Sequence, residues 1–150
     1  MKIALLTIWH EKNYGAELQA YATVKVLEQM GHNVEMIDIR LSDCSHPNWK
    51  GRVGRFITLF GPSHRKFRNF WKTNIPTTRR YKSIRDIQSN PPKADIYLVG
   101  SDQVWNPQLT KRNALLYFLN FGDTNITRIS YASSFGTDRW NHPELKDKTR

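Results

Sequence analysis

Apolar and polar residues follow one another along the chain in blocks that predict a parallel α/β fold. Residues 2–9 are almost wholly apolar, which is typical of a central strand buried on both faces. Residues 17–30 have apolar residues at helical spacing, and Gly31 is well placed to end that helix. Residues 34–39 predict a second strand. This order predicts a right-handed strand–helix–strand unit of the kind found in nucleotide-binding folds.

The predicted helix has two distinct sides. The side expected to be buried consists of Leu18, Ala20, Ala22, Val24, Val26, Leu27 and Met30. The side expected to face water consists of Glu17, Lys25, Glu28 and Gln29.

The same pattern continues after residue 93. Residues 95–99 predict a buried strand that ends at Gly100, and residues 127–132 predict a further strand that ends in a polar loop. Between them, residues 115–119 fit either a strand or a buried turn, and Asp138 could cap a final helix. The expected fold is therefore a Rossmann-like parallel sheet flanked by helices.

Residues 41–93 differ in character and predict a basic, helical insertion between the second and third strands. Apolar residues at 53, 56, 57 and 60 share one helical face, residues 66–72 suggest a basic and aromatic helix, and Ser83 could cap a third helix. The chain has a net charge of +10, and eleven of its 23 Lys and Arg residues lie between Cys44 and Arg85, where there is no Asp or Glu. The remaining twelve are matched by all 13 acidic residues. This one segment therefore carries the whole excess of positive charge.

Basic residues interleaved with aromatic ones leave more than one interpretation open. In the first, the cations face water while the Phe and Trp side chains pack on the sheet. In the second, the segment contacts an anionic membrane surface, which requires both cations and the apolar area that Phe67, Phe70 and Trp71 could supply. Nucleic acid is a third partner and is disfavoured.

Cysteine and apolar content bear on the compartment. The chain has one cysteine and hence no internal disulfide, no apolar run as long as a membrane span, and no recognisable signal peptide. We therefore expect a cytoplasmic protein, with peripheral contact at the inner face of the membrane as a further option. The five His residues show no metal-ligand spacing, so no metal is expected.

The loop at residues 100–106 follows a predicted buried strand, and open α/β sheets bind ligands at the carboxyl ends of their strands. It offers a hydroxyl, a carboxylate, two amides and an indole, which together suit a polyhydroxy ligand. These groups belong to Ser101, Asp102, Gln103, Asn106 and Trp105. The alternative is that Ser101 or Asp102 caps a short helix and Trp105 fills the core.

A second polar loop, residues 10–16, follows the first strand. It has one glycine and no G-x-G-x-x-G pattern, so a dinucleotide site is weakly supported. Backbone N–H groups near Asn13 could still receive an anion or a sugar hydroxyl, with His10 and Lys12 beside them. The alternative is that Asn13 caps the helix and Tyr14 packs. If the strands are parallel neighbours, loops 10–16, 100–106 and 133–137 share one edge of the sheet.

These stretches resemble the polysaccharide pyruvyl transferase family in order and spacing. The resemblance runs from residue 2 to about residue 140, with loop 100–106 as its most specific part, and covers residues 41–93 only in general character. The stretches that carry it are residues 13–16, 18–22, 100–106, 117–121 and 130–136.

The resemblance implies a GT-B-like architecture of two Rossmann-like halves. Residues 1–150 would be the N-terminal, acceptor-side half, with the C-terminal half absent from this chain, which alone would be an incomplete enzyme. The implied reaction moves the enolpyruvyl group of phosphoenolpyruvate onto a sugar of a cell-surface polysaccharide precursor, as a pyruvate ketal. No cofactor is expected besides phosphoenolpyruvate as donor. The implied partners are the sugar acceptor and the other half.

Ketal formation needs a general acid and a general base, together with groups that hold the substrates. We expect Asp102 and His10 to be catalytic. The expected substrate-binding residues are Lys12, Asn13, Tyr14, Gly15, Ser101, Gln103, Trp105, Asn106, Ser133 and Ser134. The alternative function is a non-catalytic module that docks on an anionic membrane or nucleic acid through its basic segment.

Overall fold

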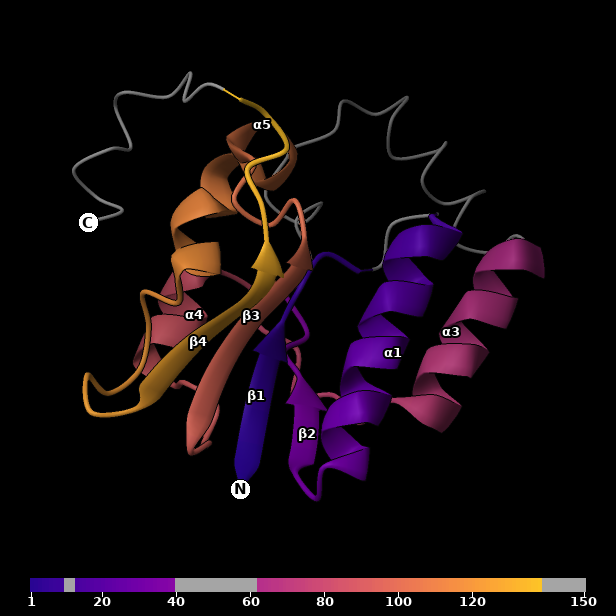
Figure 1. Cartoon of the computed structure of the whole chain (residues 1–150), viewed down its shortest axis with the longest axis horizontal. Coiled ribbons are helices and arrows are strands. Elements are labelled where there is room, and N and C mark those ends of the chain that lie inside the picture. Colours follow the sequence, from indigo (N-terminus) through magenta and orange to yellow (C-terminus); the bar gives the residue numbers. More distant parts are fainter. Residues whose placement is uncertain (10–12, 40–61, 139–150) are drawn as a thin grey trace.

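The computed structural model describes residues 1–9, 13–39 and 62–138 of the chain. Its centre is a sheet of four parallel strands in the order β2-β1-β3-β4, and the four arrowheads point the same way (Figure 1). The strands are β1 Lys2–Leu6, β2 Asn33–Met36, β3 Ile96–Asp102 and β4 Thr127–Ser133. The predicted α/β fold with a parallel sheet flanked by helices is confirmed.

Helices cover both faces of this sheet (Figure 1). One face packs against α1 and α3, and the other packs against α4 and the η2 region. The helices are α1 Tyr14–Gln29, α3 Pro62–Asn74, α4 Ile84–Ser89, α5 Pro107–Thr110 and the 3-10 helix η2 Lys111–Phe118. The apolar run at 115–119 is thus the end of η2, so of the two predicted possibilities the buried turn is correct. In the described part of the chain, none of the helices combines the length and the apolar character needed to cross a bilayer.

Alternation along the strands builds two apolar layers, as buried parallel strands require. Ile3, Leu5 and Leu98 point toward α1 and α3, where they meet Val24 and Trp71. The intervening residues of the same strands point the other way: Ala4, Leu6, Tyr97 and Val99 pack with Ile87, Leu116 and Tyr117.

Helix α1 begins and ends where local chemistry dictates. The Asn13 side chain accepts a hydrogen bond from the Gly15 N–H at 2.9 Å, and Gly31 stops the helix with a φ of +86°, a conformation that glycine adopts without a Cβ penalty. The buried stripe consists of Ala16, Ala20 and Val24, spaced four residues apart. Their small side chains let the helix lie close to the sheet.

The prediction of which side chains of α1 are buried was partly wrong. Glu17, expected to face water, is 3% exposed, whereas Leu18, Val26 and Met30, expected in the core, are 59%, 48% and 67% exposed. Burial on α1 depends on packing against other elements, which the pattern of a single helix does not show. The Phe70 ring of α3, for example, lies 5.2 Å from the ring of Tyr21, one turn after Glu17.

The described part of segment 41–93 packs closely on the sheet. Trp71 of α3 is 4% exposed and its ring lies 4.6 Å from that of Trp9. After α3 the chain runs beside β2, forming bridges between Met36 and Thr77 and between Ile39 and Tyr81. The stripe at 53–60 lies outside the described residues, and the assignment of 41–93 as an insertion stays a prediction.

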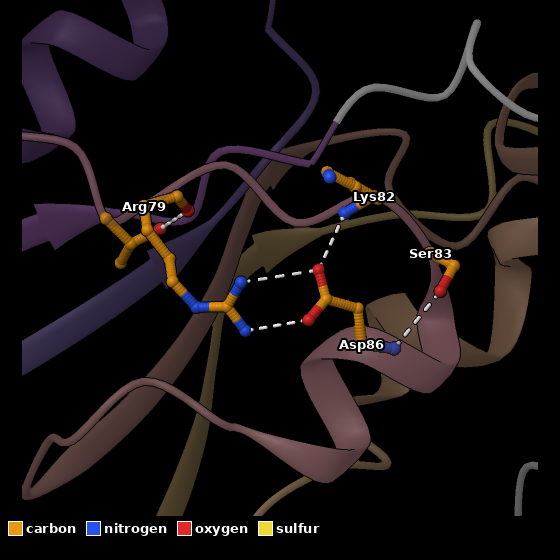
Figure 2. Close-up of polar contacts among 5 residues, drawn as sticks. Arg79, Lys82, Ser83 and Asp86 are labelled. Carbon is orange, nitrogen blue, oxygen red and sulfur yellow. Dashed lines mark hydrogen bonds and ion pairs between the residues drawn. The ribbon is translucent and has the colours of Figure 1, made fainter.

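A polar cluster fixes the entry into α4 (Figure 2). Ser83 caps the helix by accepting from the Asp86 N–H at 3.1 Å, as the sequence predicted. The Asp86 carboxylate accepts from both terminal nitrogens of Arg79, at 2.8 and 3.3 Å, and from the Lys82 N–H at 3.0 Å. The Arg79 guanidinium holds the pKa of Asp86 below its ordinary value. The stretch beside β2 is thereby tied to α4.

The segment between η2 and β4 is held by one guanidinium. Arg128 donates from Nε to the Leu119 carbonyl at 3.0 Å and from its terminal nitrogens to the carbonyls of Phe121 at 2.8 Å, Asp123 at 3.1 Å and Ile126 at 2.8 Å. Loop carbonyls that have no ladder partner are satisfied in this way. The path into β4, and hence the loop at its carboxyl end, is fixed.

Candidate functional site

The carboxyl ends of the parallel strands bring two of the predicted site loops together. The Trp105 N–H donates to the Ser134 carbonyl, and the Ser134 N–H donates to the Asp102 carbonyl, each at 3.1 Å. Asp102 and Ser133 are partners in the β3–β4 ladder. Loops 100–106 and 133–137 therefore share the edge of the sheet that the sequence predicted, and Ser133 and Ser134 lie beside Asp102.

Helix α1 is joined to this edge by a hydrogen-bonded ring that the sequence analysis missed. The Thr7 hydroxyl donates to the Ser101 carbonyl at 2.9 Å, Gln19 Nε2 donates to Thr7 Oγ1 at 3.0 Å, and the Ser101 hydroxyl donates to Gln19 Oε1 at 2.7 Å. Thr7 is 1% exposed. Two signals were available: Thr7 is a polar residue at the end of an apolar run, and Gln19 borders the buried face near the start of the helix.

Asp102 has an unusual backbone conformation at the centre of the site. Its φ is +99°, which a residue with a side chain rarely adopts and which costs about 1–3 kcal/mol. One carboxylate oxygen, Oδ1, accepts from the Gln103 N–H at 2.7 Å. The other oxygen forms no hydrogen bond with any described residue, and the side chain is half-buried. Strain of this kind persists where surrounding structure holds a residue in place, as at many binding and catalytic sites.

The amides of the loop bind mainly to the protein itself. Asn106 is 7% exposed, donates from Nδ2 to Gln103 Oε1 at 3.1 Å and accepts from the Gln108 N–H at 3.0 Å. Asn106, rather than Ser101 or Asp102, therefore caps the short helix α5. Gln103 remains exposed, whereas direct contact between Asn106 and a substrate stays a prediction.

Trp105 forms a wall of the loop. Its ring stacks on the Phe118 ring, with the centroids 5.6 Å apart and an angle of 7° between the planes. Its centroid lies 5.4 Å from that of the Phe135 ring. Its Nε1 donates to the Tyr117 carbonyl at 3.0 Å. Packing of Trp105 accords with the structural alternative drawn from the sequence, but the ring is only half-buried, so its role as a sugar platform stays a prediction.

The structure describes residues 13–16 of loop 10–16, which lie at the start of α1, and these test the alternative in which Asn13 caps the helix and Tyr14 packs. Asn13 caps the helix, as its structural alternative proposed, and Gly15 supplies the N–H that it binds. Tyr14 does not pack as that alternative proposed, since it is 70% exposed. His10 and Lys12 lie outside the described residues, so their place at the site stays a prediction.

Comparison with known proteins identifies the family. A family model for polysaccharide pyruvyl transferase matches residues 13–150, which include α1, loop 100–106 and loop 133–137. Searches with the chain matched no curated protein and no solved structure. A model match over nearly the whole chain, on a fold of the expected class, is sufficient for the assignment. The chain belongs to the polysaccharide pyruvyl transferase family.

Proposed function

We propose that the protein transfers the enolpyruvyl group of phosphoenolpyruvate onto two hydroxyls of a sugar in a polysaccharide precursor, forming a pyruvate ketal. Membership of the family supports the transferase class. The observation that carries the proposal is the polar corner at the ends of β3 and β4, where a strained aspartate stands beside serines on a hydrogen-bonded support. Oxygen groups of this kind suit sugar hydroxyls.

The reaction makes definite demands on the site. The methylene carbon of phosphoenolpyruvate gains a proton, and the first sugar oxygen bonds to the adjacent carbon, which bears the phosphate ester. The second sugar oxygen then bonds to the same carbon while the carbon–oxygen bond to phosphate breaks. The two hydroxyl protons balance the new methyl hydrogen and the proton that leaves with phosphate. A base near the sugar hydroxyls is therefore required.

Asp102 is the residue we assign to that base. An ionised carboxylate only accepts hydrogen bonds, and one oxygen of Asp102 is held by the Gln103 N–H while the other is not used by a described residue. Because no described residue competes for that second oxygen, we assign it to a sugar hydroxyl. His10 stays a predicted partner in acid–base catalysis, and phosphoenolpyruvate serves as the donor without a further cofactor.

Activity measurements test this proposal directly. Because residues 1–150 alone are expected to be an incomplete enzyme, the protein is assayed together with the C-terminal half that the resemblance implies. It is incubated with phosphoenolpyruvate and a panel of methyl glycosides, and phosphate release and the new ketal methyl signal are followed, the latter by NMR. Asp102→Asn is expected to lower the rate by about 10²–10⁴-fold, the usual contribution of a positioned base. Asp95→Asn is the matched control, because Asp95 binds the Lys2 N–H at the start of β1, at the opposite end of the sheet.

Two results would contradict the proposal. Phosphate release that needs no sugar would show hydrolysis in place of transfer. Undiminished transfer by Asp102→Asn would remove Asp102 from the base role.

A further inference from the structure

We infer that the side chains of Ser101, Asp102 and Ser133 form a corner that can only accept hydrogen bonds, and that Gln19 is the positioning residue that makes it so. Such a corner takes the hydroxyls of the sugar and excludes the phosphate and carboxylate of phosphoenolpyruvate. The inference rests on the proposed function and assigns one of its two substrates to a particular place.

The donor and the acceptor of each hydrogen bond in the ring can be assigned by starting from the Ser101 carbonyl. A backbone carbonyl only accepts, so the Thr7 hydroxyl, 2.9 Å from the Ser101 carbonyl, must donate to it. Thr7 Oγ1 has then no proton left for Gln19, so the Gln19 atom 3.0 Å away must be the amide nitrogen. The amide oxygen therefore faces Ser101, and the Ser101 hydroxyl must donate to it at 2.7 Å. Gln19 thus uses up the only proton on the Ser101 side chain.

The two neighbouring side chains are limited in the same way. The Ser133 hydroxyl donates to the Val99 carbonyl at 3.1 Å, which leaves only its lone pairs for a ligand. Asp102 is an acceptor when ionised, and the nearest backbone donor, the Gln103 N–H, is taken by its own Oδ1. Since Asp102 and Ser133 pair across β3 and β4 and Ser101 precedes Asp102, the three residues lie at neighbouring strand ends.

Such a corner discriminates between the two substrates. Phosphate and carboxylate groups bring lone pairs and negative charge, which repel the Asp102 carboxylate and find no side-chain proton here. Sugar hydroxyls bring protons and no charge. Releasing the Ser101 proton toward an anion would require breaking the bond to Gln19 and leaving a part-buried amide oxygen unpaired, which is costly.

Binding measured by NMR tests this assignment without any requirement for turnover. The labelled protein is titrated separately with methyl glycosides, with phosphoenolpyruvate and with inorganic phosphate, and the backbone amides of residues 100–103 and 133 are followed. We expect saturable shifts at these amides with a glycoside, and none with either anion. Saturable shifts there with phosphate or phosphoenolpyruvate, or no glycoside response at all, would overturn the inference.

Variants of Gln19 test the positioning role. Gln19→Met keeps the size of the side chain but frees the Ser101 proton, so glycoside affinity should fall about tenfold, as expected for one or two lost hydrogen bonds, and phosphate should begin to bind at residues 100–103. Gln29→Met, the same change at an exposed position of the same helix, should alter neither affinity by more than about twofold. Weaker glycoside binding by Gln19→Met with no phosphate response at residues 100–103 would show a merely structural role.

A second variant allows the inference to be tested even if Gln19→Met fails to fold. Ser101→Ala removes one acceptor and leaves the bond between Gln19 and Thr7 in place, so it should weaken glycoside binding without admitting phosphate. Failure of the proposed function and failure of this inference would give different results. Glycoside shifts without ketal formation would refute the reaction but keep the corner, whereas ketal formation with phosphoenolpyruvate bound at residues 100–103 would keep the reaction and refute the corner.

Discussion

Substitution of Gly100 by alanine is the most direct test of how the site is built. Gly100 has a φ of +116°, and a Cβ there would overlap the Tyr131 carbonyl oxygen of β4 and lie 2.8 Å from Ser133 Oγ. The backbone conformation alone costs an L-residue about 1–3 kcal/mol. Relief of the overlap requires β4 to move away from β3, which sacrifices ladder hydrogen bonds of about 1 kcal/mol each.

These contributions add to about 3–5 kcal/mol, a large share of the roughly 5–15 kcal/mol by which domains are stable. Gly31→Ala is the matched control, because Gly31 also has a positive φ, +86°, but a Cβ there meets nothing within 4 Å. Only the conformational cost of about 1–2 kcal/mol applies to it.

Urea unfolding followed by tryptophan fluorescence measures both variants. With a slope of about 1–3 kcal/mol per molar urea, Gly100→Ala should lower the midpoint by about 1–2 M more than Gly31→Ala does. Equal losses for the two variants would mean that β4 does not approach Gly100 as described, and the geometry of the site would fall with it.

Three further predictions concern the parts of the fold that support the site. Arg128→Lys should lower the unfolding free energy by about 1–3 kcal/mol, because an ammonium cannot reach the several carbonyls that the planar guanidinium binds, and an unchanged urea midpoint would contradict this. Because Arg79 lowers the pKa of Asp86 from its ordinary value of 3.8, their pairing stabilises the fold above that pH and is lost as the pH falls through the lowered pKa. Asp86→Asn should therefore destabilise the protein near neutral pH, and the loss should shrink as the pH is lowered below 3.8, as measured by urea unfolding across this range. Trp71→Ala should cost about 3–5 kcal/mol, since Trp71 is buried against Trp9, and a loss below 1 kcal/mol would show that α3 is not docked there.

The sequence was most informative where local chemistry decides the structure. The sequence pattern predicted all four strands, Gly31 marked the end of α1, and Ser83 marked the start of α4. Each of these depends on residues within a few positions of one another. The shared edge of loops 100–106 and 133–137 followed from parallel pairing alone.

The pattern of apolar and polar residues did not predict contacts between elements that are distant in the sequence. The packing of Tyr21 depends on Phe70 of α3, which lies more than thirty residues further along the chain. The role of Gln19 depends on Thr7 and Ser101, which belong to two different strands. A helical wheel shows neither relation, because it describes one element and not the neighbours that cover it.

The structure also bears on whether the basic segment could bind a membrane surface. Insertion into the surface of a membrane requires apolar area as well as cations. In α3 the largest aromatic side chain, Trp71, is 4% exposed, and Phe70 lies 5.2 Å from Tyr21, so both rings pack on the domain. Among the side chains of this helix that the structure describes, the exposed ones include Lys66 and Lys72, and these two would offer charge to a lipid surface.

Because attraction by charge alone depends on salt, the salt dependence of binding distinguishes membrane docking from sugar binding. Each cation near an anionic surface contributes about 1 kcal/mol, and salt screens that contribution over a Debye length of about 8 Å at physiological ionic strength. Membrane docking through α3 should therefore weaken steeply with salt, and docking by its aromatic residues would first require Trp71 to leave its partner on the sheet. Binding of a neutral sugar at the corner of Ser101, Asp102 and Ser133 involves no net charge on the ligand and should persist at the same salt concentration.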